Sequence, residues 1–291
     1  MPYLVAVTLL WAVSFSLIGE YLAGQVDSYF AVLTRAMLAG LLFLPLLRLR
    51  LLPRPVVPGL LVVGALQFGV TYICLYQSFE YISVPEVLLF TIFTPLHVAL
   101  IDDLLNRRFS LGPLVAAAIA VVGAGIIRYD GLSDNFIRGF LILQLANFTF
   151  AAGQVGYAHL VRRYELTSTQ QWRGFGLFFI GALLVMLPAW LLLGNPERLP
   201  HTTLQWSVLA WLGLVASGLG FLFWNRGAAQ VDAGTLGIMN NALVPAGLLV
   251  NLLIWNREAD LLRLAAGSVV LGLSLWVNAR WPHWFARPAQ S

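Results

Sequence analysis

The chain has 291 residues, of which 59% are hydrophobic and only 10% carry a charge. This composition and a mean hydropathy of +0.82 exclude a water-soluble globular domain, in which about 25% of residues are charged, and place the chain in a lipid bilayer. The net charge of +4 comes with 17 basic residues, all arginine and mostly in short links between apolar stretches, which favours a role in membrane topology over nucleic-acid binding.

Ten apolar stretches are long enough to cross a bilayer, which takes about 20 mainly apolar residues. In chain order they span roughly 3–23, 29–47, 57–79, 85–105, 111–128, 137–161, 172–193, 204–225, 233–254 and 261–279. The first has no basic residue before its apolar core, so we interpret it as a retained helix and not as a signal peptide. The sequence therefore predicts an all-α membrane protein with ten transmembrane helices.

The arginines predict how these helices are oriented. With the N-terminus in the cytoplasm, the cytoplasmic links and the tail hold Arg48, Arg50, Arg54, Arg107, Arg108, Arg162, Arg163, Arg173, Arg226, Arg280 and Arg287. The opposite side then holds Arg128, Arg138, Arg198, Arg257 and Arg263. Because arginines are enriched on the cytoplasmic side of membrane proteins, we expect both termini in the cytoplasm.

Two similar segments 150 residues apart indicate an internal repeat. The segment 93–108, "FTPLHVALIDDLLNRR", matches 243–258, "LVPAGLLVNLLIWNRE", so that Pro95 falls on Pro245. The chain therefore divides into two five-helix units, 1–131 and 132–291, the second of which ends in a short cytoplasmic tail. Because five is odd, the second unit enters the membrane from the opposite side, and such inverted repeats are typical of alternating-access carriers.

Longer segments resemble a known family. "FEYISVPEVLLFTIFTPLHVAL", "RFSLGPLVAAAIAVVGAGII" and "AAQVDAGTLGIMNNALVPAGLLV" resemble the repeated domain of the drug/metabolite transporter superfamily, in its EamA-type ten-helix branch. The resemblance covers nearly the whole chain, and the carboxylate, amino-acid and amine exporters are the branch that the chain looks most like. It implies a central cavity lined by the first, third, fourth, sixth, eighth and ninth helices, export of a small metabolite, and no organic cofactor.

The fourth stretch contains the most informative candidates. Pro95, like Pro245 in the ninth stretch, falls mid-helix, where a proline removes a backbone hydrogen bond and marks either a hinge beside the substrate site or a static kink. Phe90, Thr94 and His97 share one face of the same helix. Since an ionisable residue inside a membrane is a functional hypothesis by default, we expect His97 to contact the substrate. A neutral histidine bonded to a neighbouring helix and a proton carrier are the alternatives.

Other aromatic and polar residues complete the candidate substrate site. Aromatic rings mixed with amides suit a ligand with an apolar body and a polar end. We expect Asn240 to contact the substrate, whereas Asn241 serves equally well to join helices; Trp224 stays unassigned. The remaining candidates are Trp11, Ser14 and Phe15 in the first stretch, Tyr72 and Tyr76 in the third, and Asn147 and Gln154 in the sixth.

The charged residues near or within the stretches are expected to have structural partners. Glu20 and Arg35 both lie toward the outer side, so an ion pair between them is the simplest expectation. Asp102 and Asp103 are expected to pair with Arg107 or Arg108, about one turn further on. We predict a structural or topological role for these four residues, and no part in ion coupling.

The sequence as a whole predicts a secondary transporter of the bacterial inner membrane. It would export an amino acid, amine or carboxylate by alternating access through a central cavity, with the substrate and membrane lipids as partners, no nucleic acid, and a monomer with an oligomer left open. A flippase for lipids or lipid-linked sugars is the alternative, and a passive channel fits the paired prolines poorly. Because the chain lacks the Gly-Lys-Ser/Thr and His-Glu-x-x-His motifs, we predict no enzyme activity, no cofactor and no metal site.

Overall fold

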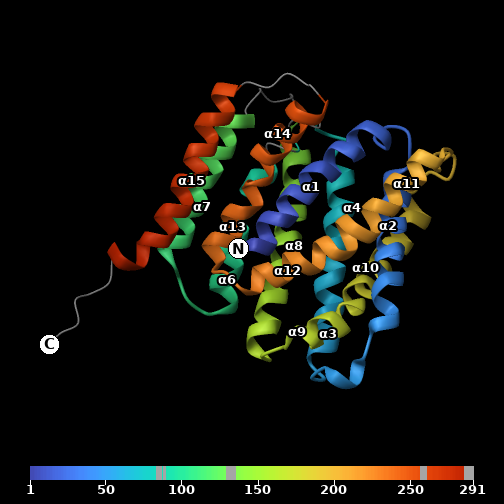
Figure 1. The fold of residues 1–291 in the computed structure, drawn as a ribbon, viewed down its shortest axis with the longest axis horizontal. Helices are drawn as coiled ribbons and strands as arrows, with labels where there is room; N and C mark the ends of the chain where they lie inside the picture. The colour runs from blue at the N-terminus through green and yellow to red at the C-terminus, as the bar shows by residue number, and fades with distance from the viewer. Residues whose placement is uncertain (83–86, 88–89, 129–135, 256–260, 285–291) are drawn as a thin grey trace.

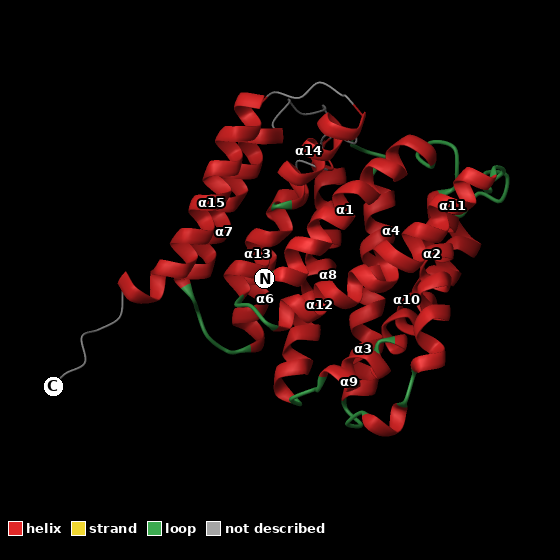
Figure 2. Ribbon diagram, in the orientation of Figure 1, coloured by secondary structure: helices red, strands yellow, loops and turns green. Residues whose placement is uncertain are grey.

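A computed structural model of the chain describes residues 1–82, 87, 90–128, 136–255 and 261–284. These residues are helical apart from short turns and loops, and they contain no strand (Figure 2). Helices are the expected outcome because lipid offers a backbone no hydrogen-bond partners, so each segment must satisfy its own N–H and C=O groups. The predicted all-α class is confirmed.

The helices follow one another with short connections (Figure 1). The first half contains α1 (Pro2–Tyr21), α2 (Ser28–Phe43), two 3-10 turns (Leu44–Leu46 and Leu49–Leu51), α3 (Val56–Gly64), α4 (Thr71–Ser78), α6 (Thr94–Leu105) and α7 (Leu111–Arg128). The second half contains α8 (Phe136–Arg163), α9 (Ser168–Gly174), α10 (Gly176–Leu193), α11 (Thr203–Trp211), α12 (Gly220–Ala229), α13 (Ala233–Asn241), α14 (Leu243–Trp255) and α15 (Leu261–Trp284).

Eight helical segments of the described residues are long and apolar enough to cross a membrane. They are Pro2–Tyr21, Ser28–Leu46, Val56–Ser78, Phe136–Arg163, Ser168–Leu193, Thr203–Ala229, Ala233–Ile254 and Leu262–Trp281. The stretch predicted at 111–128 forms α7, whose apolar part is shorter, and the stretch predicted at 85–105 begins among residues outside the described ranges. The count of ten, the inverted units 1–131 and 132–291 and the cytoplasmic termini therefore stay predictions.

The two proline-containing stretches are helical with a short interruption before each proline. Pro95 lies in the first turn of α6, directly after a 3-10 turn at Thr91–Phe93. Pro245 lies in the first turn of α14, which begins just after α13 has ended at Asn241. A proline is tolerated in a first turn because its missing N–H would have no partner there. Pro245 still lies inside the membrane-long segment Ala233–Ile254, and the predicted choice between a hinge and a static kink stays open for both prolines.

Two other spans contain a π-helical segment, a wider turn in which hydrogen bonds reach one residue further back. Ala65–Val70 joins α3 to α4, and Leu212–Leu219 joins α11 to α12. Their starting residues lie 147 positions apart (212 minus 65), close to the offset between the two prolines. Such π segments often occur at functional sites.

Glycines let several helices approach closely. A β-carbon at Gly64 of α3 or Gly181 of α10 would overlap a backbone carbonyl of the other helix. The approach of α7 to α15 at Gly123 is less close, since a β-carbon there would lie 3.1 Å from the backbone of Gly267 and Leu271. These two helices run side by side at one edge of the molecule (Figure 1). Small residues at such crossings are the usual means by which membrane helices pack. Helix α8 packs against α3, α4, α6 and α12.

The ion pairs at the end of α6 match those predicted from the sequence. Arg108 Nη2 lies 2.7 Å from Asp102 Oδ2, and Arg108 Nε lies 3.5 Å from Asp103 Oδ1. Since Arg108 is largely exposed, with 56% of its side-chain surface open, these pairs add little to stability. The predicted partnership of the two aspartates with a following arginine is confirmed.

Asp232 caps α13 and ties it to α15. Its carboxylate accepts hydrogen bonds from Thr235 N at 2.9 Å, Thr235 Oγ1 at 2.7 Å and Asn278 Nδ2 at 2.7 Å. Burial works to raise the pKa of Asp232, but these hydrogen bonds outweigh it and hold the pKa below its ordinary value. The charged carboxylate is therefore part of the folded structure at neutral pH.

Candidate functional site

The indole rings of Trp11 and Trp224 meet between α1, α8 and α12. Their centroids lie 4.9 Å apart with an angle of 30° between the planes. Trp224 is 2% exposed, and its Nε1 donates a 2.8 Å hydrogen bond to Oε1 of the completely buried Gln154. A buried indole N–H needs such a partner. Gln154, a predicted substrate contact, thus lies beside the tryptophan that sequence reasoning left unassigned.

A second amide faces Gln154 from α13. Gln154 Nε2 lies 3.4 Å from Asn240 Oδ1, and Asn240 Nδ2 lies 3.4 Å from Gln154 Oε1. Asn240 Nδ2 also donates to Leu236 O at 2.8 Å. Well-formed N–H···O bonds measure about 2.7–3.2 Å, so the two amides are only loosely paired. Both amides therefore keep hydrogen-bonding capacity that short bonds to each other would use.

Aromatic rings extend from the tryptophans toward α4. The centroid of Trp11 lies 5.2 Å from that of Phe221, which lies 5.1 Å from Phe68. Phe68 in turn lies 4.9 Å from Tyr72. These separations are within the range for interacting rings, about 4.5–7 Å. We name as the aromatic–amide cluster the residues Trp11, Phe68, Tyr72, Phe150, Phe221, Trp224, Gln154 and Asn240.

The π segment Leu212–Leu219 fixes the orientation of Trp11. The Nε1 of Trp11 donates a 2.8 Å hydrogen bond to the carbonyl oxygen of Ala216, within that segment. A β-carbon on Gly220, which follows the segment, would lie 2.9 Å from the same Nε1. The indole is therefore held between a backbone carbonyl and a glycine, and this arrangement places its ring in the cluster.

Other predicted site residues bond backbone carbonyls at the break before α6. Asn147 Nδ2 donates to Phe90 O at 2.8 Å, and Gln144 Nε2 donates to the same oxygen at 3.2 Å. Thr94 Oγ1 donates to Thr91 O at 2.7 Å. In a membrane a carbonyl without a helical partner must find another donor. The structure gives Asn147 and Thr94 this structural role, and their contact with substrate stays a prediction.

Asn241 and His97 bond the next two carbonyls of the same break. Asn241, 2% exposed, donates from Nδ2 to Ile92 O at 3.0 Å and to Ala120 O at 3.2 Å. His97 Nδ1 lies 3.2 Å from Phe93 O, and the half-buried ring leaves Nε2 for another partner. Asn241 therefore joins α13 to the segment before α6 and to α7, which is one of the two roles predicted for it. The role of His97 at the substrate stays a prediction.

The remaining candidates lie at different depths. Ser14 is buried and its hydroxyl donates to Leu10 O at 2.7 Å, within its own helix. Phe15 is 48% exposed. Tyr76 continues the aromatic row, with its centroid 6.0 Å from that of Tyr72. Tyr76 thus adjoins the cluster, whereas the hydroxyl of Ser14 bonds within its own helix and Phe15 is largely exposed.

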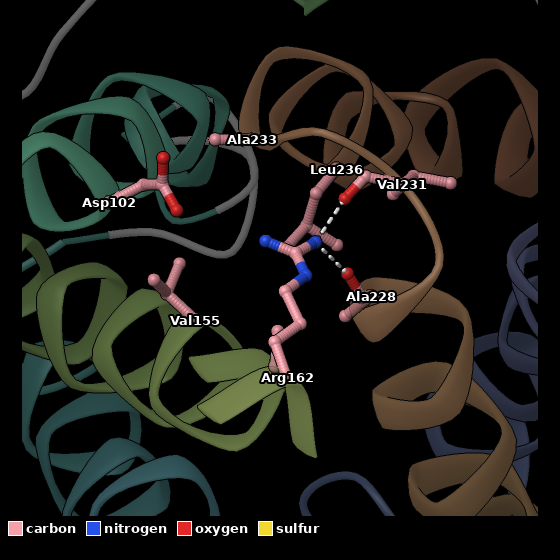
Figure 3. A pocket seen from close by; sticks show the side chains of 8 residues that line it. Asp102, Val155, Arg162, Ala228, Val231, Ala233 and Leu236 are labelled. Atoms are coloured by element: carbon pink, nitrogen blue, oxygen red, sulfur yellow. Dashed lines mark hydrogen bonds between the residues drawn. The ribbon is translucent and has the colours of Figure 1, made fainter. Parts of the chain in front are cut away.

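A small pocket lies between α6, α8, α12 and α13 (Figure 3). It is lined by Asp102, Val155, Ala158, Arg162, Ala228, Val231, Ala233 and Leu236. Arg162 Nη2 donates to Ala228 O at 3.2 Å and to the carbonyl of Val231. Ala228 lies in the last turn of α12, where the helix dipole attracts a cation, and Val231 follows the end of that helix. Arg162 therefore ties α8 to the end of α12.

Comparison with known proteins identifies the family. The EamA-like transporter family matches residues 1–129. A Pseudomonas aeruginosa protein named probable biotin transporter is 65% identical over 278 residues, which cover 96% of this chain and 97% of that protein. The chain belongs to the EamA-like transporter family. Proteins named biotin transporter from Escherichia coli K12 and Salmonella typhimurium are each 51% identical over 282 residues, covering 97% of this chain and 93% of theirs.

A solved structure supports the fold. Described only as the crystal structure of a protein, it superposes with a TM-score of 0.77 at 16% sequence identity, covering 98% of this chain and 96% of its own. Together with the family, the apolar helices make this chain a multi-pass protein of the bacterial inner membrane. It is a transporter of a small metabolite and not an enzyme, as the sequence predicts.

Proposed function

We propose that this transporter carries biotin across the inner membrane. The observation that carries the proposal is the loosely paired amides of Gln154 and Asn240 at the end of an aromatic row. They occur in a chain that is 65% identical to a protein named probable biotin transporter. Aromatic walls with a few convergent polar groups are typical of small-molecule sites.

The chemistry of biotin matches the two parts of the cluster. Biotin has a cyclic urea with N–H donors and a carbonyl acceptor, fused to an apolar ring that contains sulfur, and a chain that ends in a carboxylate. The amides of Gln154 and Asn240 supply an acceptor for a urea N–H and a donor for the urea carbonyl. The rings of Trp11 and Trp224 supply apolar surface, and a thioether sulfur interacts favourably with aromatic rings.

The broken helices support transport by alternating access. One break precedes Pro95 and the other precedes Pro245, one in each predicted half of the chain. Interrupted helices near the substrate are typical of secondary transporters built from inverted repeats. Asn241, at the end of α13, bonds the carbonyl of Ile92 in the other break, so a movement at one break reaches the other. We therefore infer that both prolines act at hinges.

The tie formed by Arg162 supports a closed cytoplasmic end. With both termini in the cytoplasm, the ends of α8 and α12 lie on that side, and Arg162 holds them together through the carbonyls of Ala228 and Val231. A substrate that passes between these helices requires those hydrogen bonds to break. We therefore propose that this conformation of the transporter is closed toward the cytoplasm.

Binding of radiolabelled biotin to the purified protein tests the proposed substrate. Unlabelled biotin should displace the label at a lower concentration than amino acids, amines or lipid phosphates. Displacement by an amino acid or amine alone would restore the substrate class predicted from the sequence, and displacement by a lipid phosphate would favour a flippase. Vesicles of both orientations would then decide whether transport runs outward, as the resemblance implies, or inward.

A further inference from the structure

The guanidinium of Arg35 is buried within the predicted membrane region. Arg35 lies in α2 and is 5% exposed. Its Nε donates to Ser217 Oγ at 3.0 Å, its Nη2 donates to Tyr72 Oη at 3.1 Å, and its Cζ lies 5.2 Å from the centroid of the Tyr72 ring. All of these partners are neutral. Within the described part of the chain Arg35 forms no ion pair, so Ser217 and Tyr72, and not the predicted Glu20, are its partners.

A buried cation with neutral partners is an unusual arrangement. Removing a charge from water is costly unless the charge is paired, and charged groups inside a membrane usually mark a substrate or ion pathway. Arg35 uses only its Nε and Nη2 groups for the hydrogen bonds to Ser217 and Tyr72. The planar fork of a guanidinium has further N–H donors, and its geometry matches a carboxylate.

Arg35 lies at one end of the aromatic–amide cluster. Its partner Ser217 directly follows Ala216, whose carbonyl holds the indole of Trp11. Its other partner, Tyr72, belongs to the row of rings that leads to Trp11 through Phe68 and Phe221. The cation and the cluster therefore share both a backbone segment and a row of rings.

The amides lie at the opposite end of the same row. Ser217 and Trp224 are seven residues apart (224 minus 217), so they lie on similar faces of the span, about 10 Å apart along its axis. Trp224 donates to Gln154, which pairs with Asn240. A ligand lying along the row would thus meet a cation at one end and neutral amides at the other.

We propose that Arg35, oriented by Ser217 and Tyr72, binds the carboxylate of the substrate while Gln154 and Asn240 bind its uncharged polar end. The inference rests on the proposed function and defines the substrate class as an elongated monoanion with an apolar body. Recognition by Arg35 would be charge-assisted, through parallel N–H···O bonds to the two carboxylate oxygens. An analogue in which a neutral amide replaces the carboxylate loses this interaction and keeps the urea contacts.

The test compares biotin with biotinamide as competitors for labelled biotin. The wild-type protein should prefer biotin by about 10- to 100-fold, the range expected for a hydrogen-bonded charge. In Arg35→Gln the affinity for biotin should fall, the affinity for biotinamide should change little, and the preference should approach one. Arg48→Gln is a matched control because Arg48 is exposed and bonds only nearby carbonyls, so it should keep the wild-type preference.

The outcomes separate this inference from the proposed function. If the wild-type protein does not bind biotin, the proposed function fails. If it binds biotin and biotinamide equally, or if Arg35→Gln keeps the wild-type preference, biotin stays the substrate and the role of Arg35 is overturned. Should Arg35→Gln not accumulate in the membrane, Arg35→Lys decides: its ammonium lacks the planar fork, so the preference should fall several-fold, and an unchanged preference would overturn the proposal.

Discussion

Replacing Gln154 by leucine removes the polar centre of the aromatic–amide cluster. Leucine cannot accept the 2.8 Å hydrogen bond from Trp224 Nε1, and it loses both 3.4 Å contacts with Asn240. An orphaned buried donor costs about 1–3 kcal/mol, and the two long contacts add little. We therefore expect Gln154→Leu to lower the free energy of unfolding by about 1–3 kcal/mol.

The same substitution should weaken biotin binding. Losing one or two neutral hydrogen bonds to the urea is worth about 1–2 kcal/mol, which corresponds to a dissociation constant raised about 5- to 30-fold. Equilibrium binding of labelled biotin to protein in detergent measures this change. Thermal unfolding of the same samples measures the loss of stability.

Gln144→Leu is the matched control. Gln144 lies in the same helix, donates to Phe90 O at 3.2 Å and accepts from Asn147 at 3.2 Å, but it lies ten residues from Gln154, about 15 Å along the helix. It should lower stability and leave the affinity for biotin unchanged. The reasoning is refuted if both variants lose affinity equally, or if Gln154→Leu binds biotin as the wild type does.

Three further changes test other parts of the structure. Gly220→Ala puts a β-carbon 2.9 Å from Trp11 Nε1 and should reduce biotin transport several-fold, whereas Gly272→Ala, with nothing within 4 Å, should not; equal transport by the two variants would contradict this. Asn241→Leu leaves two buried carbonyls without their side-chain donor and should lower unfolding stability by about 1–3 kcal/mol, with an unchanged thermal midpoint as the contrary result. Because the pKa of Asp232 is lowered in the folded state, its stabilisation is present above the ordinary aspartate pKa and lost as the pH falls through the folded value. Asp232→Asn should therefore be less stable than wild type at neutral pH, and the difference should shrink in acid; a difference that grows on acidification would reverse the assignment.

Much of the fold follows from composition and periodicity. Apolar stretches of membrane-spanning length have one solution in lipid when no barrel pattern is present, which is the helix, and the described residues are helical. The two prolines are visible in the sequence, but the side chains that bond the backbone near them are not. A kinked helix and a broken one both lack the same backbone hydrogen bond. The carbonyl that Pro95 leaves without its helical partner is that of Thr91, four residues back, and Thr94 Oγ1 donates to it.

The candidate site shows what sequence patterns convey about polar residues. An amide that caps a carbonyl and an amide that binds substrate look the same in the sequence, because the partner of Asn241 lies 149 residues away. Trp224 stayed unassigned because its partner Gln154 lies 70 residues away. The aromatic row had a visible signal, since Phe68, Tyr72 and Tyr76 are spaced by four residues along one helix face.

Arg35 illustrates a different difficulty. Sequence reasoning marked it as a charge inside a membrane and paired it with Glu20, an acidic residue expected on the same side. One of its partners in the structure is Ser217, 182 residues away, a contact that exists because α2 packs against the π segment Leu212–Leu219. A neutral partner cannot be found by matching charges along the chain.

Counterflow in proteoliposomes tests the central claim most directly. Vesicles containing the purified protein are loaded with unlabelled biotin and diluted into labelled biotin, so that only a carrier that exposes its site alternately to the two sides exchanges one for the other. The account predicts rapid, saturable accumulation of label in loaded vesicles and slow uptake in empty ones, with exchange reduced in Gln154→Leu. Label uptake that is the same in loaded, empty and protein-free vesicles would contradict it.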